Sequence, residues 1–135
     1  GLLREGVRAV REYAPGAEVM LHVALGGQAE ESQRFFDAMN EYGVEYDIIG
    51  QSYYPEWHGT LEELEANTNA LVLKYNKPLI VVEYRDHYLD IERIVSSLPN
   101  GLGRGTFIWE ATSPQWGKLF DESGATTEAI RAYNR

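Results

Sequence analysis

Two kinds of apolar pattern alternate along the chain. Short continuous apolar runs occupy residues 17–23, 46–52, 78–83 and 105–109, and such runs are typical of strands buried on both faces. In the longer segments around them apolar residues recur every three to four positions, which predicts amphipathic helices over residues 2–13, 28–42, 60–75, 89–98 and 126–133. Thr60 and Glu63 form a capping-box pattern at one of these starts. The pattern therefore predicts a helix followed by four strand–helix units, with residues 56–59 as a loop.

This alternation is typical of a parallel sheet covered by helices, so the predicted fold class is α/β. Four units match half of an eight-stranded (β/α)8 TIM-type barrel, and they also suffice for a small open doubly wound sheet. A nucleotide-binding sheet of the second kind needs a glycine-rich phosphate loop after its first strand. Because Gly26-Gly27 does not form a G-x-G-x-x-G motif, we favour the half barrel, with residues 1–135 as a single domain.

Composition narrows the classes of partner. A formal net charge of -9 argues against nucleic acid and anionic membranes as partners. The chain contains no Cys, which excludes disulfides and thiolate metal sites. No apolar run is long enough to span a bilayer, and no signal-peptide pattern is present. Because the sequence opens directly on a helical pattern without a cap, we expect the chain to be a fragment or a processed piece.

Aromatic and polar residues gather where the predicted strands end. In parallel sheets these ends share one rim, which is where barrel enzymes place their active sites. Aromatic faces can cover the C–H faces of sugar rings, while carboxylates and imidazoles bind the hydroxyls. The alternative is that the aromatic residues fill a core. The residues of this predicted sugar-binding rim are His22, Tyr53, Tyr54, Trp57, His58, Glu83, Trp109 and Glu110.

Glu83 is the candidate catalytic residue, because a carboxylate at the end of a buried strand is costly unless it is used or paired. It could act as a nucleophile or general base, or form a structural ion pair with Arg85. Glu110 could supply a second carboxylate, although a role as a hydrogen bonder at the rim is the better interpretation. The spacing of the histidines and nearby acids matches no metal-ligand pattern, so we expect no metal and no cofactor.

Two stretches resemble a known family. Residues 47–64 read D-I-I-G-Q-S-Y-Y-P-E-W-H-G-T-L-E-E-L, and residues 71–83 read L-x-x-K-Y-N-K-P-L-I-V-V-E. Together with G-T-F-I-W-E and L-F-D-E-S-G further on, they resemble glycoside hydrolase family 53, the arabinogalactan endo-β-1,4-galactanases. The resemblance implies an extracellular or periplasmic retaining glycosidase that acts on β-1,4-galactan, with this chain as strands five to eight of its barrel.

The resemblance also implies roles for individual residues. Glu83 would be the nucleophile, flanked or hydrogen-bonded by Tyr53 or Tyr54. Trp57 and His58 would line the substrate, and Trp109 would form a platform under the sugar. The peptide after Trp109 would be a candidate cis bond, which costs about 3–4 kcal/mol.

The sequence also departs from the family pattern. Residues 84–87 read Y-R-D-H where the family usually has a Thr followed by an aromatic–Pro pair. The short loop there makes calcium doubtful, and residues 27–29 lack the Asp that the family tends to carry. The family's acid/base Glu, in an Asn-Glu pair, has no counterpart. We therefore expect this chain alone to be inactive.

Several alternatives remain at this point. They are a non-catalytic carbohydrate-binding half barrel, an inactive fragment, and a β-glycosidase of the same clan with another glycan substrate. A half barrel would also expose two sheet edges, through which copies of the chain could self-associate.

Overall fold

The computed structural model describes residues 1–133. In chain order its elements are α1 (Leu2–Tyr13), β1 (Met20–Val23), α2 (Ala29–Glu41), β2 (Ile48–Ser52), α3 (Pro55–His58), α4 (Leu61–Tyr75), β3 (Leu79–Glu83), α5 (Tyr88–Ser96), the 3₁₀ turn η1 (Pro99–Gly101), β4 (Gly103–Thr106) and the 3₁₀ helix η2 (Glu128–Tyr133). None of the helices within residues 1–133 has the length and apolar character needed to cross a membrane.

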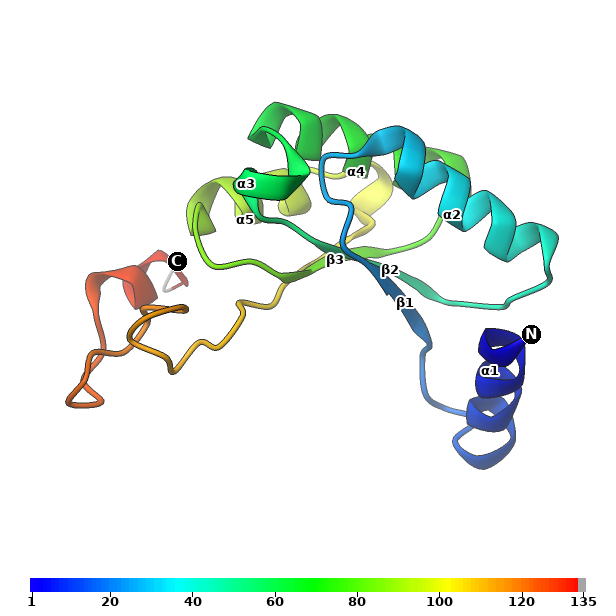
Figure 1. Ribbon diagram of the computed structural model, residues 1–135, viewed down its shortest axis with the longest axis horizontal. Helices are drawn as coiled ribbons and strands as arrows, with labels where there is room; N and C mark the ends of the chain where they lie inside the picture. Colours follow the sequence, from blue (N-terminus) through cyan, green and yellow to red (C-terminus); the bar gives the residue numbers. More distant parts are fainter. Residues whose placement is uncertain (134–135) are drawn as a thin grey trace.

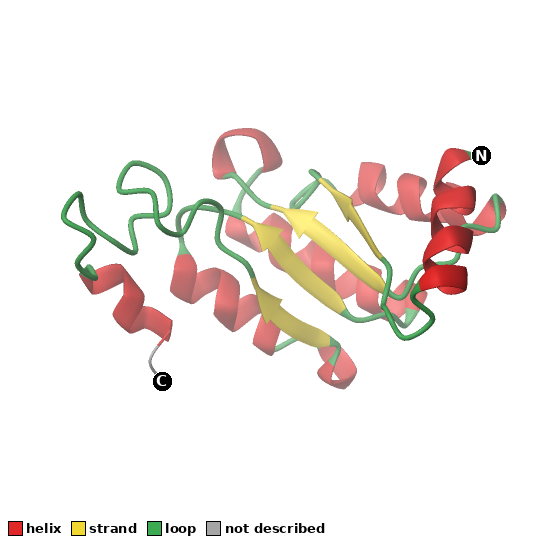
Figure 2. Cartoon of the chain, turned by 90° about the horizontal axis from the view of Figure 1, so that it is seen from below, coloured by secondary structure: helices red, strands yellow, loops and turns green. Residues whose placement is uncertain are grey.

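The four strands form one parallel sheet in the order β1-β2-β3-β4. Helices α2, α4 and α5 cover one face of the sheet, whereas its other face carries no helix over the strands (Figures 1 and 2). Helix α1 lies to the side of the sheet, away from the three covering helices. The predicted alternation of strands and helices is therefore confirmed, and the sheet is covered by helices on one face.

The core lies between the sheet and its covering helices. Ile49 on β2 and Leu79 and Val81 on β3 are fully buried, as are Leu64 on α4 and Ile91 on α5. Side chains on alternate strand positions point to opposite faces, so these strand residues leave their neighbours facing the uncovered side. On β3 these neighbours, Ile80 and Val82, are partly exposed.

Helix α4 begins where the sequence predicts. The Thr60 hydroxyl accepts a hydrogen bond from the Glu63 backbone N–H at 3.2 Å, and the Glu63 carboxylate accepts one from the Thr60 N–H at 2.7 Å. The capping box is thus complete, and it satisfies two N–H groups that a helix start otherwise leaves free.

Three predicted elements need correction. Residues 56–59 are not all loop, because α3 makes one helical turn there that starts with Pro55 at a position proline favours. Strand β4 lies at Gly103–Thr106 and not at 105–109. The last helix is the 3₁₀ helix η2, which starts two residues later than predicted.

The chain around Trp109 differs from the expected cis peptide. No cis peptide bond occurs among residues 1–133, so the prediction for the bond after Trp109 was wrong. The chain turns there through a left-handed backbone at Glu110, where φ is 45°, and this avoids the larger cost of a cis non-proline bond. Trp109 still lies beside the end of β3, because its N–H donates to Tyr84 O at 2.8 Å.

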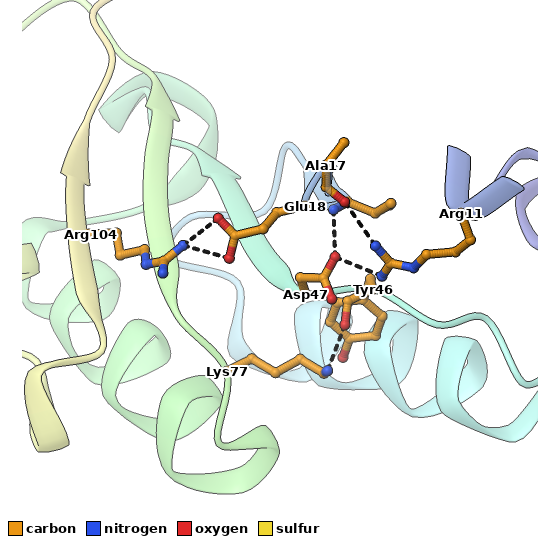
Figure 3. Close-up of polar contacts among 8 residues, drawn as sticks. Arg11, Ala17, Glu18, Tyr46, Asp47, Lys77 and Arg104 are labelled. Atoms are coloured by element: carbon orange, nitrogen blue, oxygen red, sulfur yellow. Dashed lines mark hydrogen bonds and ion pairs between the residues drawn. The ribbon is translucent and has the colours of Figure 1, made fainter. Parts of the chain in front are cut away.

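Polar contacts tie the amino-terminal ends of the strands together (Figure 3). Glu18, just before β1, pairs with Arg104 on β4 at 2.7 Å, which joins the two edges of the sheet. Asp47 accepts hydrogen bonds from Arg11 at 2.7 Å and from the Val19 N–H at 2.6 Å. These contacts hold the end of the sheet opposite to the predicted rim.

Candidate active site

Glu83 is the last residue of β3, as predicted. The Tyr54 hydroxyl donates a hydrogen bond to its Oε1 at 2.9 Å. Within residues 1–133 Glu83 forms no ion pair; Arg85 pairs instead with Glu56 and Asp86. The alternative interpretation, a structural ion pair between Glu83 and Arg85, was therefore wrong. The carboxylate is held by a neutral hydroxyl and not by an ion pair.

A pocket of about 250 Å³ opens beside Glu83. This volume lies below the range of about 300–1,000 Å³ that is typical of complete small-molecule sites. Glu83 is the one acidic residue among the lining side chains. The residues that line the pocket are Tyr54, Trp57, Glu83, Arg85, Trp109 and Trp116. Aromatic walls around one carboxylate suit a ligand that has both C–H faces and hydroxyl groups.

Tyr54 links the aromatic wall to the carboxylate. Its ring packs edge-on against Trp57, with 5.4 Å between the ring centroids. Burial, together with the hydrogen bond to Glu83, raises the pKa of Tyr54 well above its ordinary value. The hydroxyl therefore remains protonated at neutral pH and acts as a hydrogen-bond donor to Glu83.

His58 holds Tyr54 from behind. Its Nδ1 accepts a hydrogen bond from the Tyr54 backbone N–H at 3.0 Å. A nitrogen that accepts from an N–H carries no proton of its own, so the neutral ring is protonated on Nε2. Burial lowers the pKa of His58 and favours this neutral form. His58 is buried, does not line the pocket and supports Tyr54 from behind. Its contact with substrate stays a prediction.

Tyr53 points away from the pocket. It is buried in the core at 1% exposure, and its hydroxyl donates to Gly59 O at 3.0 Å. Alternation along an extended backbone sends Tyr53 and Tyr54 to opposite sides, and only Tyr54 reaches the Glu83 carboxylate. The sequence left open which tyrosine would do so.

His22 and Glu110 lie outside the pocket lining. His22 is exposed on β1, and its Nε2 is 2.7 Å from the Ser52 hydroxyl oxygen. Glu110 is exposed in the turn after Trp109. The structure therefore brings Tyr54, Trp57 and Trp109 to Glu83, and leaves His22 and Glu110 away from the pocket wall.

Two lining residues were missed by the sequence reasoning. Arg85 was considered only as an ion-pair partner of Glu83. Trp116 lies in the loop after β4, within S-P-Q-W-G, and was not considered as a site residue. An aromatic residue enclosed by Pro and Gly in a loop that follows a strand end was the available signal.

Within residues 1–133, no three His, Asp or Glu side chains lie close enough together to hold a metal ion.

The fold matches half of an eight-stranded α/β barrel. The solved structure titled "Ignisphaera aggregans GH53 catalytic domain" superimposes with a TM-score of 0.87 over 98% of this chain, at 23% identity. The model of glycosyl hydrolase family 53 matches residues 1–92, so the chain belongs to this family. The matched region includes Glu83 and ends before Trp109. The predicted family resemblance and fold class are both confirmed.

Two curated relatives extend the comparison. A Niallia circulans protein named "Uncharacterized protein in bgaB 5'region" is 35% identical over 149 residues, covering 86% of this chain and 40% of the relative. The "Arabinogalactan endo-beta-1,4-galactanase" of Cellvibrio japonicus (strain Ueda107) is 40% identical over 88 residues, covering 61% of this chain and 23% of the relative. The chain spans less than half the length of these relatives, and 50% of the Ignisphaera structure.

Proposed function

We propose that Glu83 is the nucleophile of a retaining glycoside hydrolase of the galactanase type, and that this chain provides the fifth to eighth strands of its barrel. One observation carries the proposal. Glu83 ends a barrel strand, is the one acid in an aromatic pocket, and is held by the Tyr54 hydroxyl without a cation. Active sites of such barrels lie at this end of the strands.

The chemistry requires a second carboxyl group. In a retaining glycosidase the nucleophile attacks the anomeric carbon, and the bond from that carbon to the leaving oxygen breaks as an acid protonates the oxygen. The same second group then removes a proton from water, which releases the sugar from the enzyme. The two carboxyl groups lie about 5–5.5 Å apart. Because Glu83 is the one carboxyl group among the described residues that line the pocket, we propose that strands outside this chain supply the acid/base. We also propose that this chain by itself is inactive.

The substrate we propose is β-1,4-galactan, a neutral polysaccharide. The Cellvibrio relative is named for action on arabinogalactan. In this chain Arg85, the one cation lining the pocket, is already engaged by Glu56 and Asp86. It is therefore not free to bind an acidic sugar, and the Glu83 carboxylate would repel one. A neutral hexose needs no free cation in the pocket and is not repelled by the Glu83 carboxylate.

A second candidate function is carbohydrate binding without turnover. The presence of one carboxyl group in the pocket favours it. In that case Glu83 would bind a sugar hydroxyl, and Glu83→Gln would keep a hydrogen-bonding group at the same place.

Reducing-sugar release from β-1,4-galactan distinguishes these functions. Three proteins are compared: this chain, this chain joined to the first four β/α units of a family 53 relative, and the joined protein with Glu83→Gln. We expect release from the unmutated joined protein alone. If Glu83→Gln leaves the rate of release unchanged, Glu83 is not the nucleophile. If the joined protein binds galactan but releases no sugar, the second candidate is favoured.

The proposal extends to the association of the chain with itself and to its location. The described edges β1 and β4 each pair on one side only, so we propose self-association of the isolated chain, which light scattering coupled to gel filtration would measure. We also propose action outside the cytoplasm, since a polymeric substrate does not enter the cell. Detection of the protein only in the cytoplasmic fraction of its host would refute this.

A further inference from the structure

The side chain of Arg85 lies between two aromatic walls of the pocket. Its guanidinium carbon is 5.8 Å from the ring centroid of Tyr54 and 5.2 Å from that of Trp116. Both distances fall within the range of about 6 Å over which a cation is attracted to an aromatic face. One guanidinium therefore contacts both the segment that follows β2 and the loop that follows β4.

Two carboxylates fix the orientation of this guanidinium. Arg85 donates from Nη2 to Glu56 on α3, and its Nε lies 3.3 Å from Asp86 Oδ2. Asp86 in turn lies 3.4 Å from Lys118 Nζ, two residues after Trp116. A planar guanidinium held on two sides has a defined plane as well as a position. The network Glu56–Arg85–Asp86–Lys118 thus joins α3 to the loops that follow β3 and β4, with two charges of each sign.

The two aromatic walls differ in what else holds them. Tyr54 is buried and hydrogen-bonded at both ends, to His58 through its N–H and to Glu83 through its hydroxyl. Trp116 is 38% exposed, and within residues 1–133 its indole stacks on no other aromatic ring. We therefore expect the direction of the indole to depend on Arg85, and Tyr54 to keep its place without it.

The backbone under Trp116 is anchored separately. The Tyr88 hydroxyl donates to Gly117 O at 2.9 Å, and the Trp116 N–H donates to the Ser113 hydroxyl at 3.2 Å. A Cβ at Gly117 would lie 2.3 Å from Glu110 O, so the loop is closed tightly on itself there. Loss of Arg85 should therefore release the side chain of Trp116 and leave its loop in place.

We propose that Arg85 is a positioning residue that holds Trp116 as a sugar-facing wall of the pocket beside Glu83. The identity of the ligand as a neutral sugar rests on the proposed function; the positioning of Trp116 does not. Because Trp116 lines the pocket together with Arg85, the part of the indole that the guanidinium leaves uncovered can contact the C–H face of a sugar. Removal of Arg85 should weaken ligand binding and leave the reaction of the bound ligand at Glu83 nearly unchanged.

The positioning is tested first on the chain itself. The protein has three Trp residues, so Trp57→Phe with Trp109→Phe leaves Trp116 as its only tryptophan, which can be excited selectively over the tyrosines. In this background we expect Arg85→Met to raise the acrylamide quenching constant of Trp116 about twofold, and Arg85→Lys to give an intermediate value because it keeps charge without the planar group. Arg93→Met is the matched control, because Arg93 on α5 pairs with Glu65 on α4 and does not line the pocket. Quenching that is the same with Arg85→Met as with Arg93→Met would overturn the proposal.

The role in the pocket is tested on the joined barrel described above. With β-1,4-galactotetraose, we expect Arg85→Met to raise Kd and KM about three- to tenfold and to change kcat less than about twofold. A kcat loss at unchanged KM would overturn the proposal, since it would mean that Arg85 acts through Glu83. If no variant binds the tetrasaccharide, the galactan assignment fails, and the quenching experiment still decides whether Arg85 positions Trp116.

Discussion

Asn67 on α4 is the polar side chain that holds the turn after β1, and its removal should destabilise the chain measurably. Its buried Nδ2 donates to Gly26 O at 2.7 Å, to Leu25 O at 3.1 Å and to the Ser32 hydroxyl at 3.1 Å. In the same turn the Gly26 N–H donates to Ser52 O at 3.1 Å, two residues before Tyr54. Asn67→Ala therefore tests a link between a buried helix position and the rim.

The magnitude follows from the partners that are left behind. Leu25 O keeps hydrogen bonds from the Gln28 N–H and the Ser32 hydroxyl, so the main loss is at Gly26 O. A lost hydrogen bond costs about 0.5–1.5 kcal/mol, and a buried unpaired acceptor about 1–3 kcal/mol. The Asn67 Oδ1 is itself buried without a partner, and removing it offsets part of this cost. We expect a net loss of about 2 kcal/mol in the free energy of unfolding.

Urea and thermal unfolding followed by circular dichroism would measure this loss. An unfolding entropy of about 2.1 cal/mol/K per residue gives roughly 0.28 kcal/mol/K for a chain of this length, so Tm should fall by about 7 °C. Asn69→Ala is the matched control, because Asn69 lies on the same helix and donates only to Glu65 O within it. A loss with Asn67→Ala no larger than that with Asn69→Ala would refute the reasoning.

Three further outcomes are expected. In the joined barrel, Tyr54→Phe should lower kcat about 10- to 100-fold with little change in KM, because a hydrogen bond to a charged group is worth about 1.5–3 kcal/mol; an unchanged kcat would contradict the role given to Tyr54. Burial lowers the pKa of His58 in the fold, so stability should be fully present above about pH 6.5 and decline as the pH falls below it. His58→Asn, which keeps an acceptor for the Tyr54 N–H, should flatten the dependence of Tm on pH between about 5 and 7, and an equally steep Tm curve would count against this. Gly27→Ala should lower the free energy of unfolding in urea by about 1–3 kcal/mol, because a Cβ there would lie 2.0 Å from His58 O. Gly6→Ala, in open space on α1, should not lower it. Equal losses for the two variants would refute the close approach at Gly27.

The features predicted correctly from the sequence have local causes. The apolar run that ends in Glu83 defines a buried strand and its terminus without reference to the rest of the chain. The capping box of Thr60 and Glu63 is likewise a relation between residues three apart. These two patterns were sufficient to place the carboxylate and the helix that precedes its strand.

The features that were missed depend on contacts between distant segments. Arg85 pairs with Glu56, 29 residues earlier, and no spacing rule selects that partner over Glu83. Strand β4 reads G-R-G-T, which lacks the apolar run that marks a buried strand. The apolar residues that follow it caused the strand to be predicted too far along the chain. At the pocket, the choice between Tyr53 and Tyr54 depends on which face of β2 is covered by helices, which is a property of the assembled sheet.

The way in which Glu83 is held bears on how an active barrel would be assembled. Its hydrogen bond comes from Tyr54, Tyr54 is held by His58, and the backbone of His58 packs against Gly27. All of these residues belong to this chain, so we expect the orientation of Glu83, the proposed nucleophile, not to depend on the strands that would complete the barrel. We therefore expect completion to add the proton donor without moving Glu83. A structure of the joined protein in which the Tyr54–Glu83 hydrogen bond is broken would show instead that the two halves set the nucleophile together.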